Sequence, residues 1–203
     1  MQQSSKGKKI AMVILAAGAS TRMKTVKQLL PWKNTTLLGH TIEQGLATKV
    51  DTVFVVLGAN KEKIIPKIKD YNISIIENDD WELGIGKSIA FAVQFLSKYS
   101  NKFDSILIAL ADQPLLTASH YNKLIAKFSE SNCGIVATKQ DKTVGVPAVF
   151  SQNYFEKLSL LNQDKGAKQI IKNNLEDVWA IDAGNTTMDM DTLEDYKQIS
   201  STN

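Results

Sequence analysis

The hydrophobic positions of this chain form two patterns that alternate along most of its length. Four short runs are apolar at nearly every position and rich in β-branched residues: Ile10–Ala16, Asp51–Leu57, Ile73–Ile76 and Asp104–Leu110. Uninterrupted apolar runs of this length indicate strands that are buried on both faces, as they are in parallel sheets covered by helices. The sequence therefore predicts a mostly parallel sheet.

Between these runs, apolar residues recur at three- and four-residue intervals, which is typical of helices with one buried face. The predicted helices cover residues 38–46, residues 88–98 and the segment after Thr117, a good N-cap residue, and a weaker pattern over residues 61–69 contains Pro66. Because strands and helices alternate, we expect an α/β fold with helices on both faces of the sheet.

The last third of the chain departs from this alternation. Two apolar segments, Gly134–Thr138 and Val146–Phe150, are joined by the polar sequence KQDKT, which predicts a small antiparallel excursion on the parallel sheet. Helical patterns follow at residues 154–161 and 167–173, and a short strand is predicted at residues 178–181.

Composition and charge narrow the class of protein. The chain has 203 residues and a net charge of +3, and three of its lysines fall in residues 1–9, which we expect to be a flexible tail before one domain at residues 10–203. This mild charge gives no support to nucleic-acid binding. No apolar run has the length of a membrane span or of a signal-peptide core, so we expect a cytoplasmic protein without a membrane partner. The single cysteine, Cys133, excludes an internal disulfide and a cysteine-cluster metal site.

The first apolar run ends in a segment suited to binding an anion. The sequence MVILAAGASTRMKTVKQLLPW changes from a strand to small residues, among which Gly18 can adopt a positive φ, and then supplies Arg22 and Lys27. In open α/β sheets, ligands bind at the carboxyl ends of the strands, and guanidinium groups suit phosphate oxygens. The alternative is a tight strand-to-helix turn with two solvated cations.

Two more specific phosphate-binding motifs are excluded. The loop has one glycine, so the G-x-G-x-x-G of a dinucleotide site is missing. The sequence GKS at residues 86–88 resembles the end of a P-loop, but Trp81 stands where a P-loop requires its first glycine.

Two acidic segments are candidates for holding a metal ion. Asp112 follows the fourth apolar run in ALADQPLL, and Mg²⁺ often takes only one or two protein carboxylates beside a triphosphate. An Asx turn before Pro114 would also explain Asp112. Asp191, in MDMDTLEDY, fits an ordinary helix start unless the fold brings it to Asp112. If the fold does so, the two acids could share one ion; if it does not, Asp189 would be the next candidate.

Two further segments could contact a ligand or simply begin a helix. Gly84 and Gly86 would allow close packing against a flat ligand, and Ser88 offers a hydroxyl, although Ser88 would also serve near an N-cap. The sequence DKGAKQII at residues 164–171 could place a helix N-terminus at an anion, or Asp164 could cap that helix.

Taken together and in order, these motifs resemble a known family. LAAGASTRM, KQLLPW, GIGKSI, ADQP, GVPAVF, DKGAK and DMDTLEDY are similar to motifs of the MobA-like nucleotidyltransferases, over roughly residues 10–199. The combination of LAAG, LLPW, a G-x-G-x-S turn and DQP most resembles the molybdenum cofactor cytidylyltransferase branch, whereas the guanylyltransferase branch usually has LAGG. The resemblance implies a Rossmann-like sheet of the nucleotide-diphospho-sugar transferase type.

The resemblance also implies roles for particular residues. Those of the triphosphate loop are Leu15, Ala16, Ala17, Gly18, Arg22 and Lys27, of which Arg22 and Lys27, with Asp112, are the catalytic candidates. The base-recognition turn would contain Gly84, Gly86 and Ser88. Asp112 resembles the principal metal ligand and Asp191 the second one. The pterin side would contain Gly145, Val146, Pro147, Asp164, Gly166 and Lys168.

The chain departs from the family pattern at four of these places. Lys24 and Val26 stand where the family usually has glycine and proline, and Ile85 replaces a methionine. Lys168 replaces an arginine, which removes bidentate geometry toward an anion.

The activity that the resemblance implies is transfer of CMP from CTP to the phosphate of molybdopterin, with Mg²⁺ as cofactor and a molybdoenzyme or its chaperone as a downstream partner. The nucleophile would already be an anion, so positioning and charge neutralisation would suffice. The alternatives are a nucleotidyltransferase with another specificity, for GTP and molybdopterin or for a sugar or polyol phosphate, and a nucleotide-binding regulator without turnover.

Overall fold

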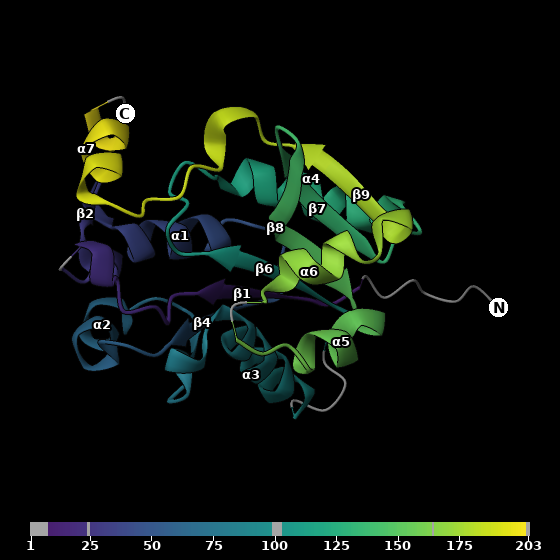
Figure 1. Cartoon of the computed structure of the whole chain (residues 1–203), viewed down its shortest axis with the longest axis horizontal. Helices are drawn as coiled ribbons and strands as arrows, with labels where there is room; N and C mark the ends of the chain where they lie inside the picture. The colour runs from purple at the N-terminus through teal and green to yellow at the C-terminus, as the bar shows by residue number, and fades with distance from the viewer. Residues whose placement is uncertain (1–7, 24, 99–102, 164, 202–203) are drawn as a thin grey trace.

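The sheet observed in a computed structural model of the chain confirms the predicted fold class. The structure describes residues 8–23, 25–98, 103–163 and 165–201, so most of the predicted tail lies outside the described residues. Its sheet has seven strands, in the order β5-β4-β1-β6-β8-β7-β9 (Figure 1). The parallel half consists of β1 (Ile10–Leu15), β4 (Thr52–Leu57), β5 (Ser74–Glu77) and β6 (Ser105–Leu110).

Helices cover both faces of this sheet. One face packs against α3 (Ile85–Ser97), α5 (Phe155–Ser159) and α6 (Ala167–Lys172). The other packs against α1 (Leu37–Leu46), α2 (Lys61–Ile68) and α4 (Ala118–Glu130). Alternate residues of β1 enter the two cores, with Val13 on the first side and Met12 on the second, and every residue of β1 is buried. This explains why the strand is apolar throughout.

The antiparallel excursion is present but longer than predicted. Strand β8 (Thr143–Ser151) pairs antiparallel with β6 and with β7 (Ile135–Gln140), and β9 (Val178–Asp182) then runs parallel to β7. The strands continue through most of the predicted KQDKT turn and leave only two residues between them, with Asp141 at a φ of 51°. The helix predicted at residues 154–161 is shorter, because the 3-10 turn η4 (Gln152–Tyr154) precedes α5.

Helix α3 begins earlier than predicted, whereas helix α2 forms over nearly the predicted residues. Helix α3 begins at Ile85 rather than near Ser88, and Gly84, with a φ of 94°, occupies the N-cap position. Helix α2 forms although it contains Pro66, because its apolar residues Ile64 and Ile68 are fully buried. Packing therefore outweighs the weak local pattern at α2.

The C-terminal segment returns to the N-terminal third of the chain. Helix α7 (Leu193–Ser201) lies beside the small hairpin of β2 (Pro31–Trp32) and β3 (Thr35–Thr36) (Figure 1). Tyr196 donates a hydrogen bond of 2.8 Å to the carbonyl of Pro31, and a small separate core contains Trp32, Leu37, Met190 and Ile199. This packing brings the acidic segment before α7 to the loop after β1.

None of the helices in the described part of the chain is both long and apolar enough to cross a membrane.

Candidate active site

The loop after β1 is held in place by a buried glutamine. The amide nitrogen of Gln28 donates hydrogen bonds of 2.9 Å to the carbonyls of Ala16 and Gly18, and Ser20 donates to its oxygen. Gln28 is 5% exposed, and it follows Lys27 in the 3-10 turn η2 (Lys27–Leu29). Sequence reasoning missed this residue, because a single glutamine has no distinctive pattern.

Gly18 does not adopt the positive φ that a glycine permits. The left-handed residue of this loop is Ser20, with a φ of 57°. A Cβ added to Gly18 would have no heavy atom within 4 Å, so the glycine leaves the surface of the loop open here. Ala17 is buried and its carbonyl accepts from the backbone N–H of Ala59 at 3.0 Å, which makes it a packing residue in this structure.

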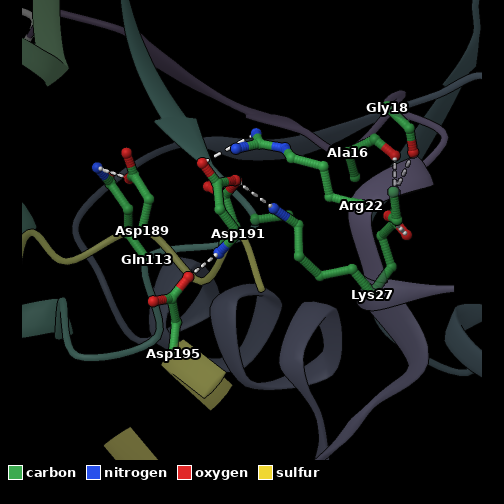
Figure 2. Close-up of polar contacts among 12 residues, drawn as sticks. Ala16, Gly18, Arg22, Lys27, Gln113, Asp189, Asp191 and Asp195 are labelled. Carbon is green, nitrogen blue, oxygen red and sulfur yellow. Dashed lines mark hydrogen bonds and ion pairs between the residues drawn. The ribbon is translucent and has the colours of Figure 1, made fainter. Parts of the chain in front are cut away.

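Two cations from this loop meet two carboxylates from distant parts of the sequence (Figure 2). The Nζ of Lys27 lies 2.7 Å from Oδ2 of Asp112 and 3.2 Å from Oδ1 of Asp191. The Nη2 of Arg22 lies 2.9 Å from Oδ2 of Asp191. The structure thus places Asp112 and Asp191 on one ammonium group, at the carboxyl edge of β1 and β6.

The segment that carries Asp191 also caps α7, as an ordinary helix start does. The carboxylate of Asp195 accepts from the backbone N–H groups of Asp191 and Thr192, at 3.0 and 2.7 Å, and the Thr192 hydroxyl accepts from the N–H of Asp195. The hydrogen bonds from Thr192 lower the pKa of Asp195. This reciprocal cap fixes the backbone that presents Asp191 to the site.

These groups surround a pocket of about 250 Å³. Its lining residues come from the loop, from the end of β6 and from the segment before α7: Leu15, Ala16, Gly18, Ser20, Thr21, Arg22, Met23, Lys27, Gln28, Ala111, Asp112 and Asp191. The side chains of Lys27 and Asp112 are 15% and 24% exposed, whereas that of Arg22 is 68% exposed. Lys27 and Asp112 therefore form the inner pair of the pocket, and Arg22 lies at its rim.

The carboxylates of this pocket fit a divalent cation that also takes ligands from a substrate. The Oδ1 of Asp112 is buried and has no hydrogen-bond partner among the described residues. Over the same part of the chain, no group of three or more histidine, cysteine or acidic residues is arranged to hold a metal. A set of two carboxylates suits Mg²⁺, which is usually bound by one or two protein carboxylates together with phosphate oxygens and water.

A second pocket, of about 200 Å³, adjoins the first at the end of β6. It is lined by Leu110, Gln113, Thr138, Gln140, Thr143, Val144, Gly145, Val146, Lys168, Thr187 and Asp189. Asp112 and Asp191 line the first pocket, whereas Gln113 and Asp189 line the second. The amide nitrogen of Gln113 donates to Asp189 Oδ1 at 2.9 Å, away from the Lys27 cluster (Figure 2). Partial desolvation and the nearby charge of Asp112 raise the pKa of Asp189.

The residues expected on the pterin side only partly come together. Gly145, Val146 and Lys168 line the second pocket. Pro147 does not line it, but its carbonyl accepts from the Thr138 hydroxyl at 2.6 Å. Gly166 precedes α6, and Asp164 lies outside the described residues.

The glycine turn expected to read the base is occupied by contacts within the protein. The N–H of Gly86 donates to the carbonyl of Gln163 at 2.8 Å, and a Cβ at Gly86 would lie within 2.6–2.9 Å of three backbone carbonyl oxygens. Ser88 is 3% exposed and accepts from the amide of Asn78. The structure therefore does not bring Gly84, Gly86 or Ser88 into the pocket of Lys27.

Comparisons with known proteins agree with this fold. The chain is 29% identical over 200 residues to the purine catabolism protein PucB of Bacillus subtilis, a match that covers 92% of this chain and 94% of PucB. It is 30% identical over 135 residues to the bifunctional protein GlmU of Pseudomonas entomophila, which covers 65% of this chain but only 28% of GlmU.

Solved structures show the same likeness. The crystal structure of Rv0371c from Mycobacterium tuberculosis has a TM-score of 0.85 and 26% identity and covers 97% of this chain and 99% of that one. A second structure of Rv0371c, in complex with manganese, has a TM-score of 0.81 and 25% identity and covers 96% of this chain and all of that one.

The model of the MobA-like NTP transferase domain matches residues 12–178, which include the loop of Lys27, the glycine turn and Asp112. The chain therefore belongs to the MobA-like NTP transferase domain family and is a nucleotidyltransferase.

Proposed function

We propose that this enzyme transfers CMP from CTP to the phosphate of molybdopterin carrying molybdenum, producing molybdopterin cytosine dinucleotide and pyrophosphate. One observation supports the transfer chemistry above all others: Arg22 and Lys27 from the loop after β1 meet Asp112 and Asp191 in one pocket. The choice of CTP and of a pterin acceptor is supported by the motifs LAAG, GIGKS and DQP, which resemble the cytidylyltransferase branch.

The reaction requires charge neutralisation and alignment more than proton transfer. The attacking group is a phosphate anion, so no general base is needed. Lys27 and Arg22 form ion pairs with carboxylates in the protein, and both are placed to exchange these partners for phosphate oxygens of the nucleotide. Their charges would stabilise the pyrophosphate as it leaves.

Asp112 and Asp191 would hold a divalent cation, and Mg²⁺ is the ion that we propose. The unpartnered Oδ1 of Asp112 supports this assignment, as does the manganese complex of the similar protein Rv0371c. When bound, the cation would neutralise charge on the triphosphate. The protein's own contribution is to position the two carboxylates through the end of β6 and the cap of α7.

The second pocket would receive the acceptor. It contains Gly145 and Lys168, and its boundary with the first pocket runs between Asp112 and Gln113. An acceptor bound there would direct its phosphate toward the nucleotide. Proximity of this kind supplies much of the rate in reactions between two bound substrates.

The direct test is incubation of the enzyme with CTP, Mg²⁺ and molybdenum-loaded molybdopterin, followed by mass analysis of the product. We expect the mass of the cytosine dinucleotide and stoichiometric pyrophosphate, and a lower rate with GTP, because a site built for one base leaves polar groups unpaired with another. Equal rates with both nucleotides would refute the choice of CTP.

A screen for pyrophosphate release with other acceptors separates the remaining alternatives. Release with a sugar or polyol phosphate, and none with molybdopterin, would identify another acceptor class. Binding of CTP without pyrophosphate release from any acceptor would indicate a regulatory protein.

A further inference from the structure

We propose that Asp189 determines acceptor specificity: its carboxylate binds two adjacent N–H donors on the edge of a flat nitrogen heterocycle in the second pocket. The inference rests on the proposed function for the identity of the acceptor, since a pterin ring has such an edge. It assigns to Asp189 a role in recognition rather than in holding the metal ion.

The position of Asp189 separates it from the cluster around Lys27. Asp112 and Asp191 contact Lys27, whereas Asp189 accepts a hydrogen bond from the amide of Gln113 and lines the other pocket (Figure 2). Gln113 is only 5% exposed, so its amide is fixed by packing and holds the carboxylate in one orientation. One hydrogen bond leaves most of the accepting capacity of a carboxylate unused.

The other polar groups of this pocket also favour a ligand that donates. Gln113 uses its nitrogen on Asp189, and its Oε1 is buried without a partner among the described residues. Thr138 donates its hydroxyl proton to the carbonyl of Pro147, so it has no proton for a ligand and accepts from His120 Nε2 at 2.9 Å. Burial and the charge of Lys123 lower the pKa of His120, which fits a neutral ring that donates from Nε2.

The pocket also contains donors. The Thr187 hydroxyl is buried and has no partner among the described residues, Gln140 carries an amide, and Lys168 is exposed at the edge of the pocket. The charge that selects between ligands beside Gln113 is the Asp189 carboxylate, which attracts the N–H groups of an uncharged ring and repels an anionic ring. Two parallel N–H···O bonds to one carboxylate give strong and directional recognition.

Part of the pocket lining is apolar. Leu110, Val144 and Val146 are half-buried and pack on the core formed with α3. A pocket that combines apolar side chains with a carboxylate suits a planar heterocycle, whose face is apolar and whose edge carries polar groups. A polyol has no such face, so this pocket favours a heterocyclic acceptor.

The test compares wild type with Asp189→Asn. Asparagine keeps an oxygen for the Gln113 bond but replaces the second acceptor with a donor. We expect the KM for molybdopterin to rise at least tenfold, while the KM for CTP and the dependence of the rate on Mg²⁺ concentration stay unchanged. The matched control is Asp182→Asn, which changes an exposed carboxylate outside both pockets and should change neither KM.

A binding measurement makes the result independent of turnover. The probe is 6-hydroxymethylpterin, followed by its own fluorescence, and we expect Asp189→Asn to weaken binding at least tenfold while thermal unfolding is unchanged. If wild type does not turn over molybdopterin but binds the probe through Asp189, the proposed function fails and the inference stands.

Three results would overturn the inference. The first is a KM for molybdopterin that is unchanged in Asp189→Asn, with normal turnover of the dinucleotide product by wild type. The second is a changed Mg²⁺ requirement in that variant, which would make Asp189 a metal ligand. The third is absence of probe binding to the wild-type protein.

Discussion

The ammonium group of Lys27 lies 2.7 Å from the carboxylate of Asp112, although one residue follows the first strand of the sheet and the other follows β6. The two strands are neighbours and parallel, with Leu15 paired with Leu110, so their carboxyl ends meet at one edge. This pair is the least exposed ionic contact of the first pocket. We therefore expect substitutions there to act on catalysis directly.

Replacing Asp112 with asparagine keeps the shape of the side chain and removes its charge. We expect Mg²⁺-dependent turnover to fall about 100-fold or more, because the charge acts in a partly desolvated pocket. Asp191→Asn should do less harm, since the Asp191 side chain is 36% exposed and Asp112 is 24% exposed. The measurement is the rate of each variant over a range of Mg²⁺ concentrations, with circular dichroism as the folding control. A larger loss of turnover in Asp191→Asn than in Asp112→Asn would contradict this prediction.

Removing the cation at the rim should affect the transition state and leave stability intact. Arg22→Ala deletes a side chain that is 68% exposed and pairs with Asp191, so the thermal midpoint should be unchanged. Loss of a charge-assisted contact to the leaving pyrophosphate should cost about 2–4 kcal/mol in kcat/KM. The control is Lys49→Ala, an exposed cation that lines neither pocket. Activity of Arg22→Ala close to wild type would refute the assignment of this loop to phosphate.

Gln28 should link stability and nucleotide affinity. Gln28→Ala removes the two hydrogen bonds that hold the carbonyls of Ala16 and Gly18, and we expect unfolding to become easier by about 1–3 kcal/mol. The KM for the nucleotide should rise, because the loop loses its fixed shape. Urea denaturation and steady-state kinetics measure the two effects, and Gln169→Ala on the exposed surface of α6 is the control. If the KM does not change, Gln28 supports only folding.

Gly86 has no room for a side chain. A Cβ there would lie 2.6 Å from the carbonyl oxygen of Lys165 and close to two more, so Gly86→Ala should destabilise the protein by about 1–3 kcal/mol. Gly145→Ala is the matched control for stability, since a Cβ at Gly145 would meet no heavy atom within 4 Å. Equal denaturation midpoints for the two variants would show that the backbone carbonyls of Asn162, Gln163 and Lys165 shift easily.

The parts of the fold that could be predicted are those with a strong local pattern. Strand β1 is apolar on both faces, and its position followed from that alone. The start of α3 could not be located by the preference of serine for N-caps, because Ser88 uses its hydroxyl on buried Asn78. Whether the chain places a serine at a cap or in a contact between elements depends on packing that no local pattern contains.

The candidate site also has residues that a local pattern predicts and residues whose roles depend on packing. The loop with Arg22 and Lys27 could be proposed because it follows the predicted strand β1, and Asp112 because it follows the predicted strand β6. The approach of Asp191 to Lys27 depends on the packing of Trp32, Met190 and Ile199, which fixes α7 against the N-terminal hairpin. Gln28 and Gln113 could not be found, since their roles depend on the atoms that surround them.

The hydrogen bond from Gly86 to the carbonyl of Gln163 joins the first turn of α3 to a residue that precedes α6, the helix of Lys168. If a nucleotide shifts the first turn of α3, Gln163 has to move with it. Thermodynamic reciprocity then requires that each substrate change the affinity of the enzyme for the other by the same factor. We expect the acceptor to change the affinity for the nucleotide by the same factor by which the nucleotide changes the affinity for the acceptor. We expect this factor to move toward 1 when the hydrogen bond between Gly86 and Gln163 is removed.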